Sequence, residues 1–178
     1  MYSTTSRLLV ERNRSPWHRM LFSEITRSLP PDERRRIVER YYLPYRDWVE
    51  TQVSAALETR ERVLHISCHS FTPRLDGEVR RADIGLLYDP RRKTEAKFCA
   101  VWQGMIRAAD PRLVVRRNYP YRGYADGLTT SLRKHYPDPA YAGIELEVNQ
   151  KFPLGDATAW RAMKKLLVAT FERTLAGR

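Results

Sequence analysis

Long apolar runs, disulfide-forming cysteines and signal sequences are scarce or missing in this 178-residue sequence. No run of apolar residues approaches the roughly 18 that a membrane-spanning helix needs, so we expect no membrane partner. The two cysteines, Cys68 and Cys99, are too few for a disulfide framework and are typical of a reducing compartment. The first residues lack the apolar segment of a signal peptide, which together with the cysteine usage predicts a cytoplasmic protein.

Internal repeats, low-complexity tracts and glycine–serine linkers are also missing, so the sequence shows no domain boundary. A chain of this length can bury a sizeable core within one domain. Hydrophobic residues make up 42% and charged residues 30%, a balance that is typical of a globular chain. We therefore predict a single domain over residues 1–178.

Acidic residues are in deficit, and the formal net charge is +11 at pH 7. A protein that binds nucleic acid is expected to concentrate its positive charge on one stripe or helix. Here the arginines are scattered in ones, twos and threes, mostly among acidic neighbours such as Asp32, Glu33 and Glu39. We interpret the charge as a solvated surface rather than a nucleic-acid interface. Such a field also suits a small anionic substrate.

Alternating β-rich and helical patterns predict an α/β fold with a mixed central sheet flanked by helices. The β-rich runs are Arg7–Arg12, Arg62–Cys68, Ile84–Tyr88, Leu113–Val115 and Gly143–Asn149. The helical patterns are Pro30–Arg60, Lys93–Ala109, Leu128–Tyr136 and Ala157–Leu175. Pro44 is expected to kink or split the first helix, and Asp156 to cap the last one. The tyrosine-rich stretch Asn118–Gly127 is dense in turn formers and predicts a surface loop.

Polar side chains gather where three of the predicted strands end. These pairs are Asn13 with Arg14, His69 with Ser70, and Glu147 with Asn149. Ligands of open α/β sheets bind at the carboxyl ends of the strands. The coincidence of three polar clusters at strand ends therefore predicts an active site there.

His69 directly follows a predicted buried strand, where an imidazole can face the crevice and bind a metal ion. Its position alone favours a structural histidine that is held by a hydrogen bond. His65 lies within the strand and is expected to pack or to form a hydrogen bond. Cys68 would point to the opposite face from His69, so we expect a core thiol.

Glu145 and Glu147 share one face of a predicted strand whose other face is apolar. Two carboxylates are costly if they are buried without partners. One interpretation is a general base near a metal-bound water. A solvated face on an edge strand would give the same alternation, and the pattern does not decide between them.

Several ordered blocks resemble the N-formylglutamate amidohydrolase family. The most specific block is HSFTPRLDGEVRRADIGLLYD, and the others include RLLVERNRS, NYPYRGYADG and GIELEVNQKF. The resemblance extends from Arg7 to the last helix. It implies a fold related to the zinc carboxypeptidases and aspartoacylases. It also implies hydrolysis of N-formyl-glutamate, or a similar N-acyl amino acid, to formate and the free amino acid.

The resemblance also implies roles for individual residues. His69 would be a zinc ligand, and Glu147 would activate the zinc-bound water, whose pKa zinc lowers to roughly 7. Glu147 would take a proton from this water and return it to the departing amine. The substrate would be a small anionic N-acyl amino acid. The residues implied to bind it are Asn13, Arg14, Asn149 and either Tyr121 or Tyr124.

Members of the family begin with a strand and a histidine-bearing loop that supply the first zinc ligands, and this sequence starts after them. We therefore expect an N-terminally shortened fold with an incomplete metal site, because a catalytic zinc usually has three protein ligands. Three explanations stay open: further residues upstream, a non-catalytic protein that binds carboxylates or other proteins, or a site completed by unexpected ligands or in an oligomer. An exposed sheet edge would favour a homo-oligomer.

Overall fold

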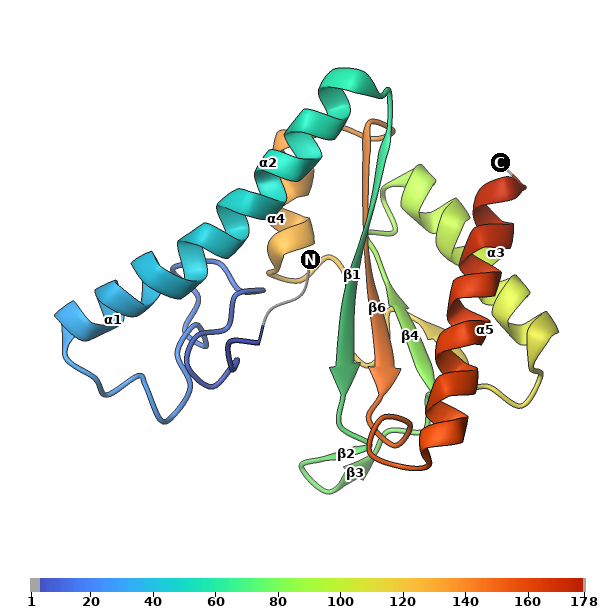
Figure 1. Cartoon of the computed structure of the whole chain (residues 1–178), viewed down its shortest axis with the longest axis horizontal. Coiled ribbons are helices and arrows are strands. Elements are labelled where there is room, and N and C mark those ends of the chain that lie inside the picture. Colours follow the sequence, from blue (N-terminus) through green and yellow to red (C-terminus); the bar gives the residue numbers. More distant parts are fainter. Residues whose placement is uncertain (1–3, 178) are drawn as a thin grey trace.

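The central feature of the computed structural model, which describes residues 4–177, is a four-stranded mixed sheet between two layers of helices (Figure 1). The strands lie in the order β1-β6-β4-β5. Their bounds are Val63–Phe71 for β1, Tyr141–Asn149 for β6, Ile84–Leu87 for β4 and Val115–Arg117 for β5. β1 is parallel to β6 and β4 is parallel to β5, whereas β4 and β6 are antiparallel. The mixed α/β fold that the sequence predicts is thus confirmed.

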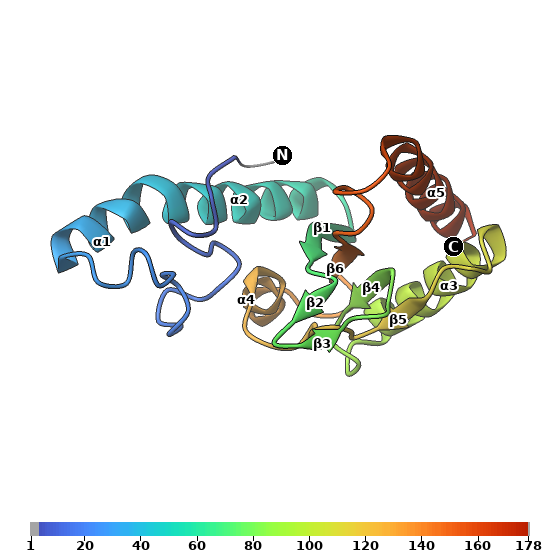
Figure 2. The ribbon, with the colours of Figure 1, turned by 90° about the horizontal axis from the view of Figure 1, so that it is seen from below.

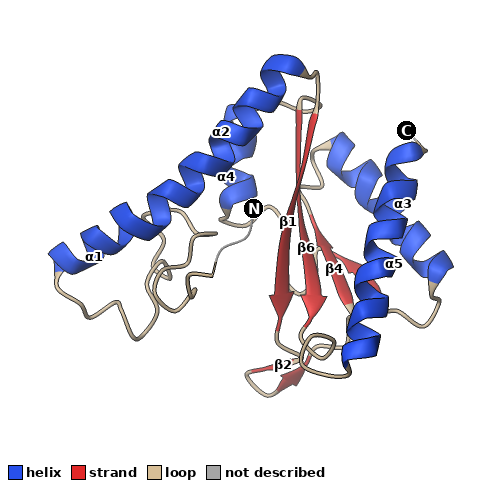
Figure 3. Ribbon diagram, in the orientation of Figure 1, coloured by secondary structure: helices blue, strands red, loops and turns tan. Residues whose placement is uncertain are grey.

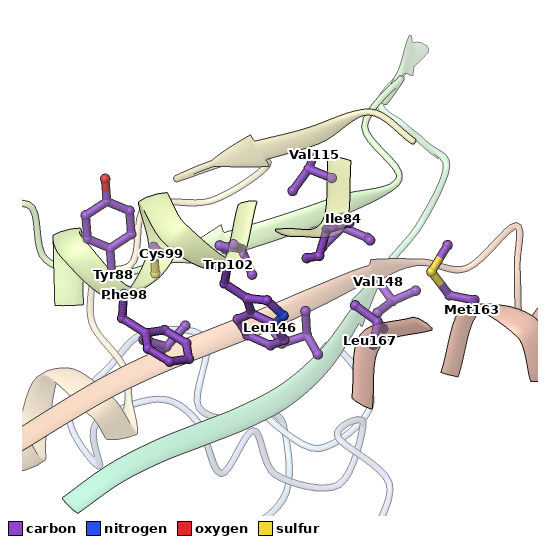
Figure 4. Close-up of a cluster of buried hydrophobic side chains, with 13 residues drawn as sticks. Ile84, Tyr88, Phe98, Cys99, Trp102, Val115, Leu146, Val148, Met163 and Leu167 are labelled. Carbon is purple, nitrogen blue, oxygen red and sulfur yellow. The ribbon is translucent and has the colours of Figure 1, made fainter. Parts of the chain in front are cut away.

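β6 is an inner strand of the sheet, and all nine of its residues are buried. This burial excludes a solvated edge strand. Alternate residues of β6 enter the larger hydrophobic core, where they pack with side chains of α3 (Lys93–Ala109) and α5 (Ala157–Ala176), including the buried indole of Trp102 (Figure 4). These core residues of β6 are Ile144, Leu146 and Val148.

The other face of the sheet meets α2 (Leu43–Thr59) and α4 (Leu128–His135), so that the sheet separates these two helices from α3 and α5 (Figure 2). A smaller hydrophobic cluster joins both helices to Tyr141, at the start of β6. This apolar cluster covers the beginning of the strand. Polar side chains on this face of the sheet are therefore found toward the carboxyl end of β6.

The long helical pattern near the N-terminus forms one continuous rod with a single π-helical turn inside it (Figure 3). It begins as α1 (Pro31–Ile37), widens to a π-helical turn, η1 (Val38–Tyr42), and continues as α2. Proline lacks an N–H group, and its ring clashes with the carbonyl one turn earlier. The π turn ends two residues before Pro44, which lies in the first turn of α2, and it is the kind of local adjustment that accommodates such a residue. The expected interruption is therefore a change of winding and not a break.

The ends of the later helices agree with the sequence pattern. α3 has the predicted bounds, and the Asp156 carboxylate caps α5 by accepting a hydrogen bond of 2.7 Å from the backbone N–H of Ala159. A short hairpin of β2 (Arg74–Leu75) and β3 (Glu78–Val79) follows β1. Within residues 4–177, no helix combines the length and apolar character that crossing a membrane requires.

Several expectations about individual segments were wrong. His69, expected just after a strand, lies inside β1, and the strand predicted at Leu113–Val115 is displaced to Val115–Arg117. Arg7–Arg12 forms turns and not a strand, because its buried residue Val10 packs against Leu21 and Tyr42 in a separate small cluster away from the sheet. Cys68 is exposed and is not a core thiol. It lies on β1, which is an edge strand, and an edge strand has a sheet neighbour on one side only.

Candidate functional site

The pairing of β1 with β6 places the polar residues of both strands on one face of the sheet. In this parallel pair Ser67 lies opposite Glu145, and His69 lies opposite Glu147. Residues that are paired across neighbouring strands point to the same face. The structure thus brings His69 and Glu147, which are 78 positions apart in the sequence (147 − 69), to adjacent positions in the sheet.

The Glu147 carboxyl group is buried, with 5% of the residue exposed, and its Oε2 atom has no hydrogen-bond partner among the described residues. Burial and, to a smaller extent, the nearby Glu145 carboxylate raise the pKa of Glu147, whereas Arg7 and Arg80 lower it, and the net result is a pKa of about 7. A buried carboxyl group without a partner is costly in structural terms. A pKa near neutrality is also what a general base needs at physiological pH.

Glu145 has a different environment although it lies only two residues away. Its Oε1 atom accepts a hydrogen bond of 2.9 Å from the hydroxyl group of Thr129, in the first turn of α4. The two neighbouring carboxyl groups are therefore unequal, since Glu145 has a partner that Glu147 lacks. Pairs of carboxyl groups in unequal environments can take different roles in acid–base chemistry.

The loop Asn118–Gly127 crosses this face of the sheet directly over β4. The carbonyl oxygen of Tyr119 approaches so closely that a Cβ atom on Gly85 would lie 2.0 Å from it, and 3.2 Å from the Glu147 Cβ atom. The Asn118 side chain holds the loop by accepting hydrogen bonds of 3.0 Å from the backbone N–H groups of Tyr88 and Gly123. The missing side chain at Gly85 is thus what allows the loop to lie beside Glu147.

Replacing Gly85 by Ala is expected to displace this loop, because the added methyl group overlaps the Tyr119 backbone. We expect a loss of about 1–3 kcal/mol in the free energy of unfolding, as for other overpacked sites, measured by urea titration. Gly104→Ala is the matched control, since no atom lies within 4 Å of its Cβ position in α3. The control should gain up to about 1 kcal/mol. Equal stability of Gly85→Ala and the parent chain would contradict this assignment.

Asn13 and Arg14 tie the N-terminal segment to the end of this loop. The Asn13 Oδ1 atom accepts a hydrogen bond of 2.9 Å from the backbone N–H of Leu128, where α4 begins. The Arg14 Nη1 atom donates to the carbonyl oxygen of Asp126 at 3.0 Å. Asn13 also lines the main cavity, whereas Arg14 does not. The two residues are therefore adjacent in sequence but unequal in their access to the site.

The structure distinguishes the two candidate tyrosines. The Tyr121 hydroxyl accepts a hydrogen bond of 3.0 Å from Arg80, whose charge acts on Glu147. The ring of Tyr124 instead lies against Arg122, with 5.9 Å between the guanidinium carbon and the ring centroid. Tyr121 is thus linked to the Glu147 region, and the contacts of Tyr124 lie with its own loop.

Asn149 is buried and holds the segment before β4 in place. Its Nδ2 atom donates to the carbonyl oxygens of Arg80 and Ala82, at 3.2 and 2.9 Å, and its Oδ1 atom accepts from the Lys151 N–H at 3.0 Å. Both N–H groups of the amide are occupied within the protein. Asn149 therefore shapes the site through the segment that it anchors and does not offer these donors to a ligand.

A cavity of about 620 Å³ lies between β1, α2 and the N-terminal segment. The polar residues that line it include Glu11, Asn13, Ser67 and His69, and His65 stands farther back along β1. The His65 Nδ1 atom forms a hydrogen bond of 2.8 Å with the Tyr141 hydroxyl, which confirms the expected structural role of this histidine. Burial lowers the pKa of His65 to about 4, so this imidazole is neutral at physiological pH.

The residues around His69 do not by themselves make a zinc centre. Its Nε2 atom lies 2.8 Å from the Ser67 hydroxyl group. No group of three or more His, Cys, Asp or Glu side chains within residues 4–177 is placed to hold a metal ion. A catalytic zinc takes three protein ligands, so the ion implied by the resemblance would need ligands beyond those gathered here. The available set does not fit the ion without such additions.

Arg80, Gly85 and Ser67 are site residues that the sequence patterns did not reveal. None of them stands at a predicted strand end in a recognisable polar cluster. Arg80 comes near Glu147 only because the chain folds back after the β2–β3 hairpin, and Gly85 looks like any glycine in an apolar strand. Their positions depend on contacts between segments that are distant in sequence.

The fold and the site together define a mixed α/β protein in which an inner strand carries the buried Glu147 carboxyl group, and the neighbouring strand pairs it with His69, which lines the cavity. The sequence model of N-formylglutamate amidohydrolase matches residues 2–153, and the chain belongs to this family. Family membership supports an amidohydrolase-like function. The family resemblance of the sequence is thereby confirmed.

A solved structure supports the fold. The protein resembles the crystal structure of a gene product from Agrobacterium tumefaciens with a TM-score of 0.77. The two are 24% identical, and the match covers 96% of this chain and 68% of the other. No curated protein matches the chain. The structural likeness, at this level of identity, concerns the fold alone.

Proposed function

We propose that this protein hydrolyses the amide bond of a small anionic N-acyl amino acid, of which N-formyl-glutamate is the first to test, with Glu147 as the general base. The observation that carries the proposal is the buried Oε2 atom of Glu147, which no described residue contacts by a hydrogen bond. The pKa of about 7 supports it, because such a group exchanges protons readily near neutral pH. The net charge of +11 is consistent with an anionic substrate.

In the proposed reaction, ionised Glu147 accepts a proton from a water molecule beside the scissile carbonyl group. The oxygen of that water bonds to the carbonyl carbon and forms a tetrahedral intermediate. Glu147 then returns the proton to the nitrogen as the C–N bond breaks. With N-formyl-glutamate, one water molecule is consumed and the products are formate and glutamate. Asn13, which lines the cavity next to the Gly127 turn, is proposed to help orient the substrate.

Zinc is proposed as the cofactor, with His69 as one ligand and with further ligands from outside the set that the described residues bring together. When bound, the ion would polarise the carbonyl group. A second function is also favoured by a specific observation, namely that the described residues contain no group of three or more side chains placed to hold a metal ion. On this alternative the protein binds acidic N-acyl amino acids without hydrolysing them. Turnover and binding therefore have to be measured separately.

The test is a formate-release assay on the purified full chain with N-formyl-glutamate, with and without added zinc, together with elemental analysis of bound metal. We expect formate and glutamate in equal amounts, with turnover that requires Glu147. Binding of N-formyl-glutamate without formate release, in protein saturated with zinc, would support the binding function instead. Neither binding nor turnover would overturn both proposals.

A further inference from the structure

Arg80 has a backbone that is held on both sides at the edge of the Glu147 region. Its N–H group donates to the carbonyl oxygen of Pro73 at 2.8 Å, and its own carbonyl oxygen accepts a hydrogen bond from Asn149. Asn149 is the last residue of β6 and lies two positions after Glu147. Arg80 is therefore fixed beside the carboxyl end of the strand that carries the proposed base.

The Arg80 side chain is oriented by Tyr121. Its Nη1 atom donates to the Tyr121 hydroxyl at 3.0 Å, and its guanidinium carbon lies 5.0 Å from the centroid of the Tyr121 ring. Tyr121 belongs to the loop that passes over Gly85, next to the Glu147 Cβ position. The pair thus joins the end of the hairpin to this loop on the Glu147 side of the sheet.

The guanidinium of Arg80 retains donors that the protein does not use. Within residues 4–177, its Nε and Nη2 atoms donate to no protein group, and the residue is only half-buried. Its partner is a hydroxyl group, and no carboxylate among the described residues forms an ion pair with the guanidinium. Its influence extends to Glu147, whose pKa it lowers against the effect of burial. A planar fork with free donors and an unpaired charge is suited to a carboxylate ligand.

Two residues that could each bind one end of a ligand lie on either side of the Glu145 and Glu147 carboxyl groups of β6. Asn13 lies near Glu145, since both would contact a side chain at Gly127, and Arg80 lies beyond Glu147. Positions 145 and 147 on a strand are separated by roughly 6–7 Å along its axis. A ligand that spans them needs a polar group at each end. An amino acid with two carboxylates has this form.

We propose that Arg80, positioned by Tyr121, binds the side-chain carboxylate of the substrate and so selects N-acyl derivatives of acidic amino acids over neutral ones. This inference rests on the proposed function for the location of the substrate. It assigns Arg80 to recognition and Tyr121 to the positioning of Arg80. Neither residue takes part in the breaking of the C–N bond.

The test compares N-formyl-glutamate with N-formyl-glutamine, which has nearly the same shape but no side-chain charge. Binding is measured by calorimetry in a Glu147→Gln background, so that the result does not depend on turnover. We expect Arg80→Gln to weaken binding of N-formyl-glutamate about 10–100-fold, the range for a lost charge-assisted hydrogen bond, and to leave N-formyl-glutamine almost unchanged. Tyr121→Phe should give a smaller loss with the same selectivity. Arg81→Gln, at the exposed neighbouring position, is the control and should change neither affinity.

Each outcome bears on the proposal. Equal weakening of both ligands by Arg80→Gln would show that Arg80 only braces the loop, and unchanged binding of N-formyl-glutamate would show that it does not contact the ligand. If the parent chain binds neither compound, the assignment fails as well. Selective loss in a protein that releases no formate would support this assignment while overturning hydrolysis. If the protein turns over, Arg80→Gln should raise KM for N-formyl-glutamate and leave KM for N-formyl-glutamine almost unchanged. The value of kcat for N-formyl-glutamine should be unaffected.

Discussion

For the proposed hydrolysis, replacing Glu147 by Gln is expected to lower the rate of formate release about 10²–10⁴-fold, because an amide cannot accept the proton that the attacking water would lose. The side chain keeps its size and its place on β6, so substrate affinity should change much less than kcat. The measurement is steady-state kinetics on N-formyl-glutamate. Glu172→Gln, on the exposed surface of α5, removes the same charge at a distance and should leave the rate unaltered. Retention of full activity by Glu147→Gln would refute its role as the base.

The same substitution is expected to stabilise the protein at alkaline pH. The pKa of Glu147 rises from its ordinary value of 4.5 to about 7 on folding, so the folded chain binds this proton more tightly than the unfolded chain does. Stability is therefore lost as the pH rises from about 4.5 through 7, in total about 3 kcal/mol. Urea titrations should show Glu147→Gln more stable by roughly that amount at pH 8, and by under about 1 kcal/mol at pH 5.

Only the combination of these two results identifies a functional carboxylate. Active-site residues often lower the stability of a protein in return for function. An ionisable carboxyl group that is kept in an apolar environment, at a cost in the free energy of unfolding, fits this pattern. A variant that is inactive but equally stabilised at both pH values would point to a general packing effect. A variant less stable than the parent chain at pH 8 would show that Glu147 is a satisfied structural residue.

Replacing Glu95 by Ala is expected to give the largest loss of stability in the chain. Glu95 is completely buried in the first turn of α3. Its Oε2 atom accepts a hydrogen bond from the Asp89 N–H, and its Oε1 atom accepts from Arg133 and from the Gly143 N–H, at 2.9–3.0 Å. Arg92 adds an ion pair at 3.2 Å. One carboxylate thus connects α3, α4, β6 and the segment after β4.

Removing this carboxylate leaves the guanidinium groups of Arg92 and Arg133 without their buried counter-charge. Breaking a buried ion pair from one side costs about 3–5 kcal/mol, against a total stability of about 5–15 kcal/mol for a typical domain. We expect a large decrease in the urea midpoint, or failure to fold. Glu95→Gln should lose less, because the amide oxygen can still accept a hydrogen bond. Glu58→Ala, exposed near the end of α2, is the control, and a loss within about 1 kcal/mol for Glu95→Ala would contradict this role.

The effect of Glu95 should reach the functional site. Arg133, which Glu95 holds, also donates to the carbonyl oxygens of Gly123 and Gly143. Gly123 lies in the loop that carries Tyr121, and Gly143 lies on β6. The Glu95 carboxylate lies outside the cavity, but through Arg133 it helps to hold the Tyr121 loop and β6 in place.

Much of the local structure of this protein could be read from its sequence. The bounds of α3, the cap at Asp156 and the two-sided character of β6 all follow from residue periodicity and side-chain chemistry within a short window. Those features depend on interactions over a few residues. The same reasoning failed for Arg7–Arg12, where a short apolar run is compatible with a strand but its burial is decided by Leu21 and Tyr42.

The sequence by itself determined the fold class, the family and the identity of Glu147 and His69 as candidates. Only the tertiary structure decided that β1 is an edge strand and leaves Cys68 exposed, that its register sets His69 beside Glu147, and that Tyr121 rather than Tyr124 accompanies Arg80. The physical reason is the range of the interactions involved. Periodicity records which side of an element is buried, whereas strand order, register and the electrostatic environment of a carboxyl group depend on residues far away in the chain.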